Sequence, residues 1–249
     1  MKALILAAGY GTRLYPVTKY FPKPLIKVGK KAIIDSLVEK LEDIEGLTGI
    51  IVVTNGRFYK QFKKWSEGLN TRHKVVIYND RTQSPEKKLG AIGDMAMVFS
   101  RQSGKEDFLV IGGDNLFKEP LVDFLDFAGS KPRNVCVGVV DVKKKQRARH
   151  YGVVRLDRCG RITDFWEKPV HPKTSLVAMC LYHFPAGKLE VCREYMGSCS
   201  TCNDTIGLYI NWLARKYSVY GFIFRDKWLD IGSHSTLRKA KKDHKKGAY

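Results

Sequence analysis

The chain has 249 residues, and its hydrophobic share of 44% is ordinary for a globular protein with a full core. No apolar run approaches the roughly 18 residues that a membrane-spanning helix needs, so no such span is expected. The 44 Lys and Arg residues outnumber the 25 Asp and Glu residues, and the net charge of +19 favours anionic partners such as nucleotides, sugar phosphates or nucleic acid.

The basic residues gather in runs that are typical of solvated surface. The runs at 143–147 and 238–246 lie where a loop and a terminal helix are expected. No motif interleaves aromatic and basic residues as RNA- and DNA-binding motifs do, so we expect no nucleic-acid partner. The chain begins with a strand-like stretch and shows no charged leader with a cleavage site, so we expect a cytoplasmic protein. A homo-oligomer stays open.

Six cysteines lie in the second half of the chain, and we expect free thiols in a cytoplasmic protein of this size. Cys199 and Cys202 form one C-x-x-C pair, and Cys192 lies nearby in the sequence. Three thiols could ligate zinc, but a single pair without a second one is a weak signal. A metal site at these cysteines is therefore left open.

The first 25 residues join a buried strand to a loop that suits phosphate groups. The apolar stretch 4–8 ends at Gly9 and Gly11, where the backbone can turn tightly and no side chain blocks a ligand. Arg13 follows, and Lys23 stands between two prolines that hold its backbone. The spacing fits neither G-x-G-x-x-G, because Leu14 replaces the third glycine, nor Walker A. Backbone N–H groups with two cations still predict an anion site, and a polyphosphate suits it best.

Strands and helices alternate through the first half of the chain. Apolar spacing predicts helices at 32–44, 57–65 and from about residue 89, and strands at 49–54, 74–78 and 108–111. This order favours a doubly wound, mostly parallel sheet with sites at the carboxyl ends of its strands. Asp114 follows such a strand end and two glycines, where it is either a turn residue or a ligand of a divalent cation.

The character of the sequence changes after residue 134. Successive strands at 135–142, 152–156, 162–166 and 176–184 predict an antiparallel or mixed portion that supplies a second substrate pocket. Helices at 185–196 and 205–217, a polar loop at 198–204 and a strand at 219–224 come next. We expect a tight loop at 228–232, which carries Asp230, and then a basic helix.

Five blocks of sequence resemble the sugar-1-phosphate nucleotidyltransferases, a family that includes glucose-1-phosphate thymidylyltransferase. They are L-A-A-G-x-G-T-R-L-x-P-x-T with P-K-P-L between residues 6 and 25, then the residues at 113–115, 151–154, 167–169 and 228–232. The blocks keep the order of the family and cover nearly the full length. At one place the chain departs from the family pattern, because Met179-Cys180 stands where a Thr-Gly pair is usual.

The resemblance implies an α/β fold with a Rossmann-like, doubly wound mixed sheet (the nucleotide-diphospho-sugar transferase, or GT-A-like, fold) and a small antiparallel sugar-binding portion. It implies one domain over residues 1–249, in which residues 1–133 mainly bind the nucleotide and residues 134–249 mainly bind the sugar phosphate.

The same resemblance assigns roles to residues at matching positions. Arg13 and Lys23 would be catalytic, and Asp114 and Asp230 would hold Mg²⁺ as the cofactor. The sugar phosphate would be bound by Asn115, Gly152, Glu167 and Lys168. The nucleotide would be bound by Leu6, Ala8, Gly9, Gly11, Thr12, Leu89 and Gly90.

The implied reaction joins an NTP and a sugar 1-phosphate into an NDP-sugar and releases pyrophosphate, with dTTP and glucose 1-phosphate as the leading substrates. Uridylyl, guanylyl or cytidylyl transfer is the alternative, including transfer to an acceptor such as choline phosphate. A glycosyltransferase that consumes an NDP-sugar is the rival enzyme class, and a nucleotide- or RNA-binding protein is the rival without catalysis.

Overall fold

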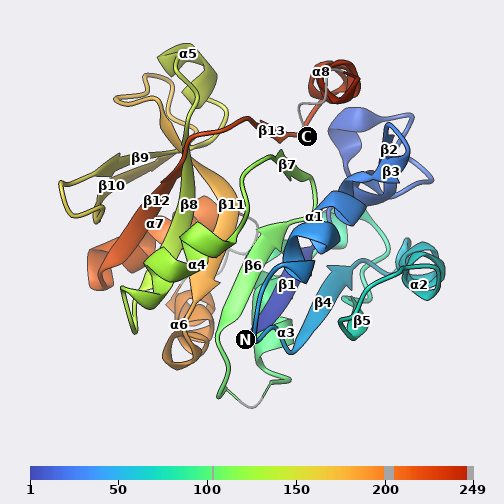
Figure 1. Cartoon of the computed structure of the whole chain (residues 1–249), viewed down its shortest axis with the longest axis horizontal. Coiled ribbons are helices and arrows are strands. Elements are labelled where there is room, and N and C mark those ends of the chain that lie inside the picture. Colours follow the sequence, from blue (N-terminus) through green and yellow to red (C-terminus); the bar gives the residue numbers. More distant parts are fainter. Residues whose placement is uncertain (103, 199–204, 246–249) are drawn as a thin grey trace. The chain divides into compact units, whose positions relative to one another are not determined.

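The structure is a computed structural model that describes residues 1–102, 104–198 and 205–245. The chain forms two compact units: residues 1–90, 111–121 and those from Asp226 on make the first, and residues 91–110 and 122–225 make the second. Figure 1 traces their helices and strands. The chain therefore leaves the first unit twice and returns to it each time. The single domain over residues 1–249 stays a prediction.

Parallel strands form the centre of the first unit. β1 (Lys2–Leu6) pairs with β4 (Gly49–Thr54), and β4 pairs with β5 (Val75–Asn79), both in parallel. All six residues of β4 are buried, as expected for a strand covered on both faces. β6 (Phe108–Gly112) leads from the second unit into the first. The strands predicted from apolar runs at 49–54, 74–78 and 108–111 are confirmed.

Amphipathic helices follow these strands in the predicted order. α1 (Ile33–Glu42) buries Ile33, Leu37 and Leu41, which share one face at helical spacing. In α2 (Tyr59–Glu67), Phe62 is buried and meets Trp65 edge to face. α3 (Gly90–Phe99) begins where the third helix is predicted, but it is mostly buried and from Ala91 on belongs to the second unit. The first unit also contains the short turns η1 (Thr12–Leu14), η2 (Lys23–Leu25) and η3 (Pro85–Lys87), and the hairpin of β2 (Lys27–Val28) and β3 (Lys31–Ala32).

A small two-stranded sheet in the first unit corrects one prediction. The expected tight loop at 228–232 is wrong for its first three residues, because β13 (Trp228–Asp230) pairs antiparallel with β7 (Asn115–Phe117). α8 (His234–His244) follows and is capped by Ser233, whose hydroxyl accepts a hydrogen bond from the Thr236 backbone N–H. The pairing brings residues 228–230 beside residues 115–117, which follow β6.

The second unit is built mainly on antiparallel strands. β10 (Ile162–Glu167) pairs with β9 (Gly152–Leu156), β9 with β11 (Leu176–Phe184), and β11 with β8 (Val135–Asp141), all antiparallel. β12 (Val219–Phe224) runs parallel to β8. The predicted mixed portion is confirmed. The remaining elements are α4 (Val122–Gly129), α5 (Lys145–Ala148), η4 (Ala186–Lys188), α6 (Val191–Ser198) and α7 (Ile206–Lys216).

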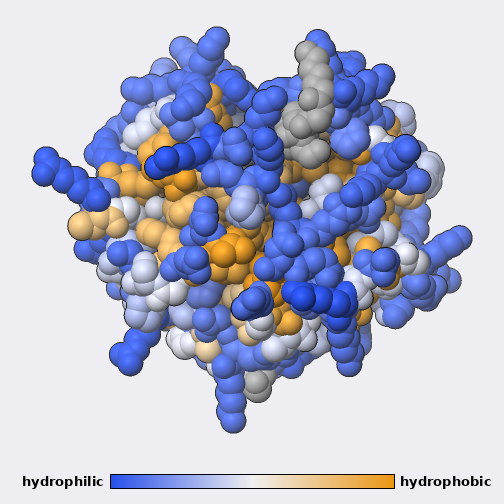
Figure 2. Space-filling view, in the orientation of Figure 1, coloured by the Kyte–Doolittle hydropathy of each residue, from blue (hydrophilic) through white to orange (hydrophobic). Residues whose placement is uncertain are grey.

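The basic runs lie at the surface, as their composition predicts. Residues 143–147 are exposed around α5, and the Arg and Lys side chains of α8 at 238, 239, 241 and 242 are exposed. Figure 2 shows hydrophilic residues over most of the visible face, with hydrophobic residues between them. Among the described residues, no helix is long and apolar enough to cross a membrane.

Candidate active site

The glycine loop after β1 is held by hydrogen bonds to its backbone carbonyl groups and has free space beside Gly9. Asn55, which follows β4, is fully buried and donates a hydrogen bond of 2.8 Å to the Ala8 carbonyl. Gly11 has a left-handed backbone with φ of 62°, and Thr18 donates a 2.7 Å hydrogen bond to its carbonyl. Gly9 is exposed, and a Cβ added there would meet nothing within 4 Å. The loop therefore offers a rigid backbone with free space beside it.

A polar network that the sequence did not reveal supports the same loop. The Tyr10 hydroxyl lies 2.9 Å from the Thr82 hydroxyl, which in turn donates to the Asp80 carboxylate at 3.0 Å. Burial raises the pKa of Asp80 against the hydrogen bonds it accepts from Thr82 and Gly56. Asp80 and Asn55 each follow a strand at its carboxyl end, and this position is the signal by which they could have been found. Leu89 and Gly90 lie partly exposed at the start of α3.

Two turns present the predicted cations. Lys23 begins η2, and hydrogen bonds from Leu25 N–H to Pro22 and from Ile26 N–H to Lys23 close this turn. Only 13% of the Lys23 side chain is exposed, and its ammonium donates a hydrogen bond to the Asp114 carboxylate. Arg13 lies in the exposed turn η1. The proline-framed lysine is thus held as its flanking residues predict.

The pairing of β7 with β13 brings Asp114 and Asp230 together. Asp114 directly precedes β7, Asp230 ends β13 opposite Asn115, and the Ile231 N–H donates a 3.1 Å hydrogen bond to the Asp114 carbonyl. A methyl group added at Gly232 would lie 2.9 Å from Asp230 Oδ2 and 3.4 Å from Arg13 Nη2. Both carboxyl groups and both cations therefore occupy one small region of the first unit.

The pKa values of the two carboxyl groups are shifted in opposite directions. Burial and the charge of Asp114 raise the pKa of Asp230 to about 7, against the opposing effect of Lys23. Burial also works to raise the pKa of Asp114, but the Lys23 charge and hydrogen bonds from Lys23 and Asp230 hold it below its ordinary value. Two facing acids with a hydrogen bond between them suit a hard divalent cation, which takes oxygen ligands and removes the repulsion.

Asn115 is buried in the first unit and is hydrogen bonded to neighbouring residues. Its side chain is 2% exposed, donates to the Gly112 carbonyl and accepts a 2.8 Å hydrogen bond from Trp228 Nε1. These bonds join β7 to its neighbours in the first unit. The contact of Asn115 with sugar phosphate stays a prediction, and its observed partners are all protein groups.

The second unit brings Gly152, Glu167 and Lys168 together. Glu167 at the end of β10 pairs with Gly152 at the start of β9, and Lys168 Nζ lies 3.4 Å from Glu167 Oε1. A Cβ added at Gly207, in the first turn of α7, would lie 1.9 Å from Glu167 Oε2. Burial raises the pKa of Glu167, and the Lys168 charge opposes the shift. Gly207 cannot be recognised from the sequence, because only the tertiary fold brings it against the Glu167 carboxylate.

At Met179-Cys180, where the sequence departs from the family pattern, Cys180 has a backbone conformation that is typical of glycine. Met179 is 1% exposed and belongs to the core, whereas Cys180 is half-buried. Cys180 has φ of 55° at an irregularity in the pairing of β11 with β8, a left-handed conformation that favours glycine. A hydrogen bond joins Cys180 to the hydroxyl of buried Tyr182.

The question of a zinc site at the cysteines stays open. Cys192 is buried, and its thiol lies 3.7 Å from the Ile92 carbonyl. Cys199 and Cys202 lie outside the described residues. Within the described part of the chain, no group of three or more His, Cys, Asp or Glu residues is arranged to hold a metal ion.

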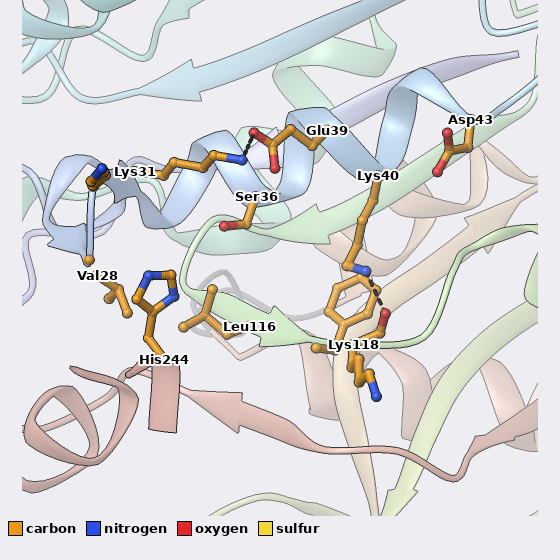
Figure 3. Close-up of a pocket in the computed structure, with 12 residues that line it drawn as sticks. Val28, Lys31, Ser36, Glu39, Lys40, Asp43, Leu116, Lys118 and His244 are labelled. Atoms are coloured by element: carbon orange, nitrogen blue, oxygen red, sulfur yellow. Dashed lines mark hydrogen bonds and ion pairs between the residues drawn. The ribbon is translucent and has the colours of Figure 1, made fainter. Parts of the chain in front are cut away.

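A pocket of about 510 Å³ opens elsewhere in the first unit (Figure 3). It is lined by α1, the end of β7, the β2–β3 turn and His244, and none of the predicted site residues contributes to it. Lys31 and Glu39 form an ion pair of 2.6 Å at its rim. Lys40 reaches along its wall to the backbone at Lys118.

The chain belongs to the nucleotidyl transferase family, whose pattern it matches over residues 2–247. The family recognised from the five sequence blocks is therefore confirmed, and with it the class of nucleotidyltransferase enzymes. The bifunctional protein GlmU of Methanocaldococcus jannaschii is 28% identical over 97% of this chain and 54% of its own length. A glucose-1-phosphate adenylyltransferase of Mycoplasma mobile is 27% identical over 98% of this chain and 66% of its own length. The chain thus spans about half to two thirds of these relatives.

Solved structures confirm the predicted fold class. A putative glucose-1-phosphate thymidylyltransferase from Bacillus anthracis superposes with a TM-score of 0.82 at 23% identity, over 97% of this chain and 94% of the other. A UDP-glucose pyrophosphorylase with bound UDP-glucose gives a TM-score of 0.81 at 21% identity, over 99% and 98% of the two chains. At these identities the likeness concerns the fold alone.

Proposed function

We propose that this chain transfers a nucleotidyl group from an NTP to a sugar 1-phosphate and releases pyrophosphate. The observation that best supports the proposal is the contact between the Asp114 and Asp230 carboxyl groups, with Lys23 and Arg13 beside them. Two acids in contact carry a free-energy cost that a bound cation removes. The donor set of two carboxylates fits Mg²⁺, which binds through one or two carboxylates and the phosphates of a substrate.

In this proposal the first unit binds the triphosphate. The backbone at Gly9, Gly11 and Thr12 faces the phosphates, and Arg13 adds positive charge. A phosphate oxygen of the acceptor attacks the α-phosphorus, a new P–O bond forms, and the bond to the β-phosphate oxygen breaks so that pyrophosphate leaves. Lys23 neutralises charge that develops on the α-phosphate. A Mg²⁺ ion held by Asp114 and Asp230 would neutralise the phosphates and the leaving pyrophosphate.

The acceptor is assigned to Gly152, Glu167 and Lys168. The Glu167 carboxylate is partly buried and can accept hydrogen bonds from sugar hydroxyls, since a carboxylate offers only acceptors. Lys168 is 61% exposed on its side chain and can turn its ammonium to a phosphate. A Cβ added at Gly152 would lie 2.4 Å from the Phe165 ring and 3.3 Å from Glu167 Oε2, so only glycine fits beside these two side chains.

For the substrates, we propose dTTP and glucose 1-phosphate as the first pair to test. The resemblance of the opening sequence blocks to the family supports this pair. The relatives named for adenylyl and uridyl nucleotides make ATP and UTP necessary members of the panel. GTP and CTP complete it, and choline phosphate is included among the acceptors.

The test is pyrophosphate release by the purified protein with Mg²⁺, each NTP and each acceptor, with the NDP-sugar product identified by mass. We expect one pair to exceed all others and no release without an acceptor. Absence of pyrophosphate from the whole panel would contradict the proposal. Consumption of an added NDP-sugar without pyrophosphate would favour the glycosyltransferase instead.

A further inference from the structure

The half-buried side chain of Lys40 forms hydrogen bonds with two consecutive backbone carbonyl groups. Lys40 lies on α1 and donates hydrogen bonds of 2.8 Å to the Lys118 carbonyl and 3.1 Å to the Glu119 carbonyl. Figure 3 shows its side chain extended along the pocket wall toward Lys118. Burial lowers the pKa of Lys40, against the charges of Asp43, Glu119 and Glu39. The half-buried ammonium thus has two fixed acceptors on consecutive residues, which a nonpolar side chain could not bind.

The two carbonyls that Lys40 binds lie directly after β7. On the other side of this segment, the Lys118 N–H donates to the Lys227 carbonyl at 3.2 Å, and the Asp226 N–H donates to Glu119 Oε2 at 2.8 Å. Residues 226 and 227 directly precede β13. Lys40 therefore binds residues 118 and 119, which in turn are hydrogen bonded to residues 226 and 227. These four residues connect β7 and β13 at the end of the sheet that lies away from Asp114 and Asp230.

This connection matters because the sheet of β7 and β13 has only three residue pairs. Two short strands are marginally stable by themselves and depend on packing and on contacts at their ends. Asp114 and Asp230 lie at the opposite end of the same two strands. A shift of one strand along the other would change the separation of the two carboxyl groups.

We propose that Lys40 is a positioning residue, which fixes the register of β7 against β13 and thereby holds Asp114 and Asp230 at the separation that a divalent cation needs. The inference rests on the proposed function for its consequence in catalysis. Its structural part, the effect of Lys40 on the small sheet, can be measured without any substrate.

The experiment compares the unmodified chain with Lys40→Met, Lys40→Arg and Lys64→Met. Lys64 is an exposed lysine of α2 and serves as the control for loss of one positive charge. Arginine can donate to both carbonyls, and the neighbouring pocket of about 510 Å³ leaves room for its larger head group. The readouts are the ¹⁹F spectrum of fluorotryptophan protein, Mn²⁺ affinity by electron paramagnetic resonance, and kcat with the best substrate pair. Trp228→Phe assigns the signal of Trp228, which lies in β13.

We expect Lys40→Met to shift the Trp228 signal, to weaken Mn²⁺ binding about tenfold and to lower kcat more than it raises the KM for NTP. Lys40→Arg should restore most of each change, and Lys64→Met should match the unmodified chain. If Lys40→Met does not fold, Glu119→Gln weakens the second link and should act in the same direction. An unchanged Trp228 signal and unchanged Mn²⁺ affinity in Lys40→Met, or in Glu119→Gln if that variant is needed, would overturn the inference. Failure of the proposed function is a separate result, in which the unmodified chain itself neither binds Mn²⁺ nor releases pyrophosphate.

Discussion

In the first unit Lys23 lies against Asp114 with 13% of its side chain exposed, whereas in the second unit Lys168 stands 3.4 Å from Glu167 with 61% exposed. The cations and carboxylates of the first unit form one closely packed group. Lys168 instead projects from a backbone that is held by a 3.0 Å hydrogen bond from its N–H to the Tyr151 carbonyl. The side chain of Lys168 is thus exposed although its backbone is held in place.

This difference indicates which kind of ligand each group of charged residues suits. Asp114 and Asp230 are two acids whose pKa values differ because their carboxyl groups are in contact. Such a pair is ready for a small, fixed cation. Glu167 has its pKa raised mainly by burial, which suits contact with neutral hydroxyl groups, and the exposed Lys168 suits an acceptor phosphate that arrives and leaves.

The largest effect is expected from Asp114→Asn, which breaks the first side of this comparison. The amide keeps the size of the carboxylate but lacks the charge that Mg²⁺ and Lys23 require. We expect kcat/KM to fall by at least about 10³-fold, or about 4 kcal/mol of transition-state stabilisation. Steady-state kinetics with saturating Mg²⁺ measures the loss.

Asp126→Asn is the matched control, because Asp126 is an exposed carboxylate on α4. It should leave kcat/KM within about twofold of the unmodified chain. Circular dichroism should show that both variants stay folded. A folded Asp114→Asn protein that keeps a near-normal rate would remove Asp114 from the metal role.

Gly207→Ala tests the second side of the comparison with a smaller effect. The added methyl group would lie 1.9 Å from Glu167 Oε2, so the carboxylate must move. We expect the KM for the sugar phosphate to rise about tenfold, which corresponds to about 1.4 kcal/mol, while the KM for NTP stays unchanged. Kinetics with each substrate varied in turn separates the two constants.

Gly197→Ala is the control for adding a methyl group to a helix of the same unit. Gly197 lies on α6, and a Cβ there would meet nothing within 4 Å. Alanine in place of a helical glycine should stabilise by about 0.5–1 kcal/mol without a change in either KM. Equal changes in both KM values of Gly207→Ala would mean that the methyl group disturbs the fold and not the acceptor group.

The sequence predicts the charged group around Asp114 in the first unit better than the group around Glu167 in the second. Asp114 could be found because it follows an apolar strand and two glycines, and strand ends are where such folds place ligands. The contact with Asp230 follows only from the family resemblance, because β7 and β13 have three residues each and show no period. The buried partners Asn55 and Asp80 were also missed, since burial of a polar residue depends on contacts across the chain. The close approach of Gly207 to Glu167 is likewise a tertiary property, and no local pattern encodes it.

Cys180→Gly should have the smallest effect of these variants. It tests whether the left-handed backbone at residue 180 lowers the stability of the second unit. Cys180 holds φ at 55°, where a side chain costs about 1–2 kcal/mol and glycine costs nothing, although glycine loses more freedom on folding. We therefore expect the variant to be as stable as the unmodified chain or up to about 1 kcal/mol more stable, despite loss of the contact with Tyr182. Cys180→Val should be clearly less stable, because a branched side chain tolerates this backbone worst. Urea unfolding of both variants gives the two free energies, and equal losses for glycine and valine would show that the side chain of Cys180, and not its backbone, decides stability there.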